Sequence, residues 1–188
     1  MQMTGHETSG LETKFCALGD RLELRDGHVI EGYASVFGAT DQGGDVVQAG
    51  AYAGSLAALR ADGRAVKMLW QHDPTQPIGV WDEVREDARG LYVKGRVLDA
   101  VAKGREAIAL MEAGAIDGLS IGYRTRRAVK DDGGRRLLTE LELWEVSLVT
   151  FPMLPSARIA AKGETPAPDF WREMAAGLRA LRLDTTGG

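Results

Sequence analysis

The stretch LLTELELWEVSLV at residues 137–149 is the longest strand candidate in the chain, and it decides the fold class. Leucine and valine alternate here with other residues, which is typical of a β-strand with one buried face. Strict alternation predicts that one face carries Leu141, Leu143, Glu145, Ser147 and Val149. A carboxylate on such an apolar face needs a partner, because an unpaired buried charge is costly. A histidine and an arginine salt bridge are the two candidates.

A second alternating stretch, GLSIGY at residues 118–123, precedes it. Period-two alternation predicts one apolar face, made of Leu119, Ile121 and Tyr123. Ser120 then shares the other face with Gly118 and Gly122, which leave open space around its hydroxyl for a peptide backbone. A small packing residue beneath a neighbouring element is the alternative interpretation of this serine.

The chain has three histidines, and one of them stands apart. His6 lies in a polar leader and His28 follows a predicted hairpin turn, so both are expected at the surface. His72 follows the apolar strand predicted at Val66–Gln71, where a sheet would hold an imidazole at its rim. A strand-end histidine that only bonds to backbone is the plainer alternative.

The remaining pattern predicts an α+β protein that is mainly β. Further strands are predicted at Arg21–Leu24, His28–Phe37, Ile78–Val84 and Gly90–Val97, and helices at Ala51–Arg60, Val101–Glu112 and Phe170–Leu183. We expect a flexible leader over residues 1–13 and one domain over residues 14–162. Residues 163–188 are expected to form a linker and an amphipathic helix.

Composition narrows the function classes. The 188 residues carry a net charge of −4, which gives no general attraction to nucleic acid. The single cysteine, Cys16, allows neither an internal disulfide nor a cysteine-based zinc site. No stretch reaches the length of a membrane span, and the N-terminus has no signal-peptide pattern. These features predict a cytoplasmic protein without membrane or nucleic-acid partners.

Ser120, His72 and Glu145 together suggest nucleophilic catalysis. Serine becomes a good nucleophile when a base takes its proton, and the base works best when a third group fixes its tautomer. The chain offers one plausible residue for each role, each on a separate predicted strand. A metal hydrolase is an alternative, with His72, Asp73, Asp41 and Asp45 as ligands, although one histidine among carboxylates is thin for zinc.

Several blocks of the chain, in this order, resemble the prohead protease family of tailed phages with the HK97-type capsid. The family's relatives also occur in phage-like gene transfer agents. The resemblance covers roughly residues 14–160 and rests on GYASVF (32–37), DVV (45–47), GAY (50–52), WQHD (70–73), IG (78–79), GLSIGY (118–123) and WEVSLVTFP (144–152).

The resemblance implies a fold and a set of catalytic residues. The family is similar to the herpesvirus assemblin proteases, which implies a closed, mostly antiparallel β-barrel with peripheral helices. By the matching motifs, Ser120 is the nucleophile and His72 the base, and Glu145 stands where assemblins have a second histidine. Asp73 or Glu142 could take that third role instead. The oxyanion donors are expected after Val149, around residues 151–154.

The resemblance also implies an activity: a serine endopeptidase that needs no cofactor or metal and acts inside the procapsid, in the cytoplasm of the host cell. The implied substrates are the scaffolding segment of the major capsid protein and the protease itself. Scaffold, portal and a second copy of the chain are further possible partners. A non-catalytic capsid assembly or scaffolding protein with the same fold is the alternative.

Overall fold

The structure is a computed structural model, and it describes residues 12–16, 23–25, 28–41 and 43–150. These residues lie in the first of two compact units, Met1–Ala157. The second unit, Arg158–Gly188, lies outside the described residues, and so does the predicted helix Phe170–Leu183. The predicted boundaries of the leader, the domain and the linker therefore stay predictions.

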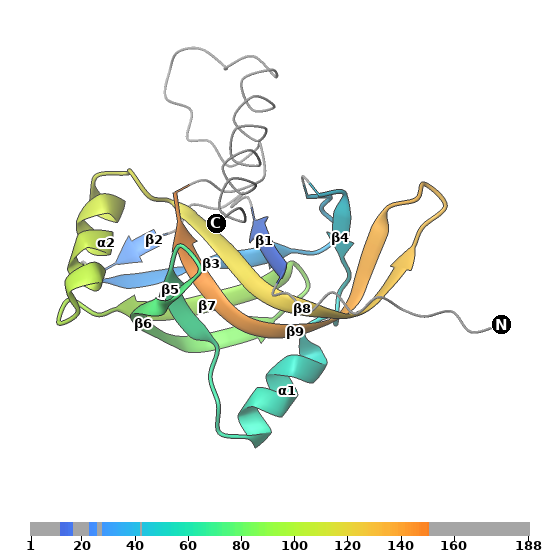
Figure 1. Ribbon diagram of the computed structural model, residues 1–188, viewed down its shortest axis with the longest axis horizontal. Coiled ribbons are helices and arrows are strands. Elements are labelled where there is room, and N and C mark those ends of the chain that lie inside the picture. Colours follow the sequence, from blue (N-terminus) through green and yellow to red (C-terminus); the bar gives the residue numbers. More distant parts are fainter. Residues whose placement is uncertain (1–11, 17–22, 26–27, 42, 151–188) are drawn as a thin grey trace, which may run out of the picture. The chain divides into compact units, whose positions relative to one another are not determined.

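Strands dominate the described part of the chain, in agreement with the mainly-β prediction (Figure 1). Its nine strands and two helices are β1 (Glu12–Cys16), β2 (Glu23–Arg25), β3 (Val29–Val36), β4 (Asp45–Val47), α1 (Ala53–Ala61), β5 (Lys67–Trp70), β6 (Asp73–Glu86), β7 (Gly90–Val97), α2 (Ala102–Glu112), β8 (Gly118–Lys130) and β9 (Arg136–Val149). Both helices lie within two residues of their predicted positions. Within the described residues, no helix is long and apolar enough to cross a membrane.

All nine strands belong to one sheet, in the order β1-β8-β9-β5-β6-β7-β3-β2, with β4 paired to β9. The pairs are antiparallel except that β4 and β5 run parallel to β9. Figure 1 shows the sheet curling along this order. Among the described residues the strand pairing starts at β1 and ends at β2, so closure into an assemblin-like barrel stays a prediction.

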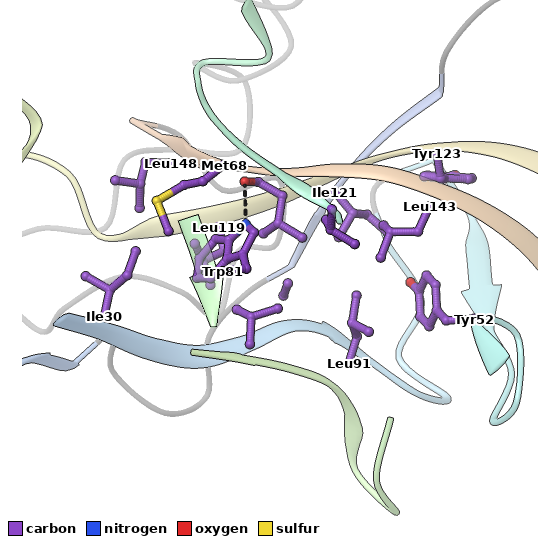
Figure 2. Close-up of a cluster of buried hydrophobic side chains, with 14 of the residues drawn as sticks. Ile30, Tyr52, Met68, Trp81, Leu91, Leu119, Ile121, Tyr123, Leu143 and Leu148 are labelled. Carbon is purple, nitrogen blue, oxygen red and sulfur yellow. Dashed lines mark hydrogen bonds between the residues drawn. The ribbon is translucent and has the colours of Figure 1, made fainter. Parts of the chain in front are cut away.

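The core lies against the concave side of the curled sheet, and β8 contributes the face that alternation predicts (Figure 2). Leu119, Ile121 and Tyr123 are all buried in this cluster. Trp81 of β6 packs beside them and donates its indole N–H to the backbone carbonyl of Val146, at 3.3 Å. Burial of these apolar side chains is the main stabilising contribution to such a sheet.

The alternation predicted for β9 is wrong at one point. Leu143 and Glu145 pair with adjacent residues of β8, so Trp144 between them is an extra residue, a β-bulge. The bulge reverses the alternation, and the core side of β9 carries Leu141, Leu143, Val146 and Leu148. Glu145 and Ser147 therefore lie on the opposite face of the sheet from Leu143. The carboxylate is buried, but not on the apolar face.

Candidate active site

His72 lies in a tight turn between β5 and β6. Trp70 pairs with Asp73, which leaves Gln71 and His72 as a two-residue hairpin loop. Both have positive φ, 52° and 61°, and they are the two non-glycine residues with positive φ in the described part of the chain. Positive φ at both central residues is the requirement of a type I′ turn, which favours Asn-Gly. Each side chain forced into this region costs about 1 kcal/mol.

Strand β9 holds this turn in place. The backbone N–H of Gln71 donates to the carbonyl of Leu148 at 3.0 Å, and its side-chain amide donates to Thr150 Oγ1 at 2.6 Å. The backbone N–H of His72 donates to Ser147 Oγ at 3.1 Å. Contacts with a distant strand thus fix a turn whose own sequence does not favour its conformation.

The imidazole of His72 joins two other strands. Its Nδ1 lies 2.5 Å from Glu145 Oε1, and its Nε2 lies 2.6 Å from Ser120 Oγ. With the ring proton on Nδ1, the ring donates to the carboxylate and Nε2 accepts from the serine hydroxyl. The structure therefore brings all three predicted residues together in one hydrogen-bonded chain.

Gly122 gives the carboxylate its place. Gly122 and Glu145 are paired across β8 and β9, and a Cβ added to Gly122 would overlap the Glu145 carboxylate. The prediction that this glycine leaves open space for a peptide backbone is therefore wrong, because the space is filled by Glu145. A glycine is needed two residues after Ser120 so that the Glu145 carboxylate can reach the imidazole.

The sequence placed Ser147 on the same face as Glu145 but indicated no role for it. It is fully buried and pairs with Ser120 across β8 and β9. Its hydroxyl donates to Glu145 Oε2 at 2.5 Å and accepts the backbone N–H of His72. The available signal was its position two residues after Glu145, which places both side chains on one face of the strand.

Comparison with known proteins identifies the family. The sequence model of the caudovirus prohead serine protease family matches residues 19–168. The chain is 34% identical over 157 residues to the prohead protease of Enterobacteria phage HK97, an alignment that covers 80% of this chain and 67% of the relative. The chain belongs to the prohead serine protease family. It is accordingly a serine protease of capsid maturation.

Two further proteins are similar to this chain. The capsid polyprotein of Pseudomonas phage PAJU2 is 30% identical over 104 residues, 51% of this chain and 15% of the polyprotein. The capsid assembly protease of bacteriophage T4 shares the fold, with a TM-score of 0.59 and 18% identity over 76% of this chain and 98% of its own.

The other candidate carboxylates of the prohead protease are engaged elsewhere. Asp73 accepts from the hydroxyl and the backbone N–H of Thr75, at 2.7 and 2.8 Å, and these bonds lower the pKa of its carboxyl. Glu142 forms an ion pair with Arg126. Neither contact leads to the imidazole, whereas that of Glu145 does.

The metal-hydrolase alternative finds little support in the same region. Asp41 accepts the backbone N–H of Asp45 at 2.8 Å, and Asp45 pairs with Arg136 at 3.5 Å. Among the residues that the structure describes, no group of three or more histidine, cysteine, aspartate or glutamate side chains is placed to hold a metal ion. The predicted oxyanion segment, residues 151–154, lies outside the described residues.

Proposed function

We propose that this prohead protease cleaves peptide bonds with Ser120 as nucleophile, His72 as general base and Glu145 as the group that orients the imidazole. The single observation that carries the proposal is the hydrogen-bonded chain from Ser120 Oγ through the imidazole to Glu145. It has the order of groups that an activated serine requires.

The chemistry follows from the positions of the protons. His72 Nε2 takes the proton of Ser120 as Oγ attacks the carbonyl carbon of the scissile peptide. The imidazolium then gives this proton to the leaving amine, which leaves an acyl-enzyme on Ser120. A water molecule loses its proton to Nε2 and attacks the ester, and the imidazolium returns this proton to Ser120 Oγ as the acid is released. Glu145 stays ionised throughout and stabilises the transient imidazolium.

The burial of the nucleophile affects how it is tested. Ser120 is 0% exposed, so a substrate carbonyl reaches Oγ only when the residues around it rearrange. The test therefore uses the protein substrate and not a small serine-reactive probe.

The proposed substrate is the major capsid protein, which is cleaved at its scaffolding segment. The chain itself is a second proposed substrate. The similarity of this chain to the capsid polyprotein of phage PAJU2 supports the capsid protein as substrate.

The proposed setting is the procapsid in the host cell, in keeping with the family. Association with scaffold, with the portal or with a second copy of the chain stays a prediction. An assemblin-like closed barrel is proposed on the curl of the sheet, because β1, at one end of the strand order, contacts β3, the strand next to the other end.

The test is co-expression of the major capsid protein with this chain and, separately, with Ser120→Ala. We expect mass spectrometry to find a shortened capsid protein with one new N-terminus in the first sample and the full-length protein in the second. Capsid protein shortened equally in both samples would contradict the assignment of the nucleophile. The experiment also maps the cleavage site.

A further inference from the structure

We propose that Ser147 is a positioning residue, whose hydroxyl fixes the His72 imidazole for proton transfer by joining the histidine backbone to the Glu145 carboxylate. The proposal rests on the proposed function of Ser120, His72 and Glu145 and deepens it. Ser147 itself touches neither the nucleophile's attacking electron pair nor the leaving group in this mechanism, so its effect is indirect.

The first argument is the closed ring of hydrogen bonds through Ser147. The backbone N–H of His72 donates to Ser147 Oγ at 3.1 Å, and the same hydroxyl donates to Glu145 Oε2 at 2.5 Å. The other carboxylate oxygen, Oε1, lies 2.5 Å from the imidazole Nδ1. The ring thus begins and ends on His72. One hydroxyl uses its single proton and an acceptor site to fix both the backbone and the side chain of the base.

The second argument concerns the strained turn. His72 holds φ at 61°, which its own sequence does not favour, so the position of the imidazole depends on contacts from outside the turn. Ser147 supplies the contact to the histidine backbone. Without that hydroxyl, the N–H of His72 and one oxygen of Glu145 each lose a partner. Ser147 is 0% exposed, so bulk water does not replace it.

A comparison with Ser35 separates positioning from packing. Ser35 lies in β3, is 2% exposed, and its hydroxyl has no hydrogen-bond partner among the described residues. Removing that hydroxyl takes away an unsatisfied polar group, so Ser35→Ala should be neutral or slightly stabilising. It deletes the same atom from an equally buried strand serine and is therefore the matched control for Ser147→Ala.

The experiment measures both variants as purified full-length chains on a fluorogenic peptide that spans the mapped capsid-protein cleavage site. We expect Ser147→Ala to lower kcat about 10- to 100-fold, the range that misplaced catalytic groups show, with KM within about twofold. Ser35→Ala should keep the wild-type kcat and KM.

A spectroscopic measurement distinguishes positioning from a general loss of structure. The ¹H NMR signal of the His72 Nδ1–H, identified by its absence in His72→Ala, reports the hydrogen bond to Glu145. We expect this signal to shift upfield or broaden in Ser147→Ala and to stay unchanged in Ser35→Ala. A signal unchanged in Ser147→Ala would overturn the proposal even if kcat fell.

A kcat of Ser147→Ala within about threefold of wild type would also overturn it. This failure is distinct from failure of the proposed function. Cleavage that persists in Ser120→Ala contradicts the triad itself, whereas an inactive Ser120→Ala beside a fully active Ser147→Ala contradicts only the role of Ser147.

Discussion

Strand β6 begins and ends at a hairpin turn, and the two turns are held in opposite ways. The β5–β6 turn places Gln71 and His72 in the left-handed region and takes its hydrogen bonds from β9, 75 residues away at Ser147. The β6–β7 turn contains no residue with positive φ and is organised by Asp87 within it.

Asp87 illustrates a turn that stabilises itself. Its Oδ1 accepts the backbone N–H groups of Arg89 and Gly90, and its Oδ2 accepts from Tyr33 and Arg85 at 2.8 and 2.7 Å. Burial alone would raise the pKa of this carboxyl, but the four hydrogen bonds outweigh it and lower the pKa to about 2. The hydrogen bond from Tyr33 to Asp87 also raises the pKa of the Tyr33 hydroxyl.

Asp87 and Glu145 therefore have different roles. Asp87 accepts hydrogen bonds from its own turn and from two neighbouring side chains, so it contributes to stability. Glu145 divides its two oxygens between an imidazole and the serine that anchors the imidazole's backbone. Glu145 therefore fixes the position of the His72 imidazole, which lies in a turn whose conformation would otherwise be unfavourable. Strain of this kind is found at functional sites, where surrounding contacts compensate for it.

The strongest test of the contrast is loss of the triad's reacting groups. Ser120→Ala and His72→Ala should each reduce capsid-protein processing by about 10⁶-fold in kcat, because members of a triad act as a unit. Thermal melting of Ser120→Ala should stay close to wild type, since Ser120 does not belong to the apolar core, whereas His72→Ala should melt lower because it removes the partner of the buried Glu145 carboxylate. Processing is measured by gel densitometry over time. Near wild-type cleavage by either variant would contradict the assignment of the triad.

The next effect is expected from Glu145→Gln. The neutral amide keeps the size of the side chain but favours the wrong imidazole tautomer, for a loss of about 10⁴-fold in kcat. Turnover of the fluorogenic peptide measures it, with Glu142→Gln as the control, since Glu142 pairs with Arg126 instead. If Glu142→Gln lost activity and Glu145→Gln kept it, the third role would belong to Glu142.

A smaller loss is expected from Gly122→Ala. The added methyl group would overlap the Glu145 carboxylate, which must shift away from the imidazole. A shift of about 1 Å costs about 10²-fold in rate. Gly54→Ala is the control, because nothing lies within 4 Å of a Cβ added there. Equal kcat values for the two variants would show that the carboxylate tolerates the displacement.

The smallest effect is expected at the other turn. Asp87→Asn should leave kcat unchanged and lower the free energy of unfolding by about 1 kcal/mol, a modest value because the side chain is 26% exposed. The carboxyl has a lower pKa folded than unfolded, so its contribution is complete above about pH 4 and is lost as the pH falls toward 2. Urea unfolding of both proteins at several pH values measures the difference, which should shrink on acidification. A difference that grew would contradict the sign.

The mainly-β class, both described helices and the apolar face of β8 could be predicted from the sequence, because each depends on a local period or a local turn signal. It also singled out Ser120, His72 and Glu145, by their neighbours and by resemblance to the family. Their catalytic roles stay predictions until the variants are measured.

The contacts among these residues could not be predicted from the sequence. Gln-His carries no type I′ turn signal, and an even alternation cannot reveal the bulge at Trp144 that moves Glu145 and Ser147 to the other face. The sequence predicted open space beside Gly122, whereas the strand register places the Glu145 carboxylate there. Periodicity describes one strand, whereas these contacts depend on the register between strands far apart in the chain, which no single stretch encodes.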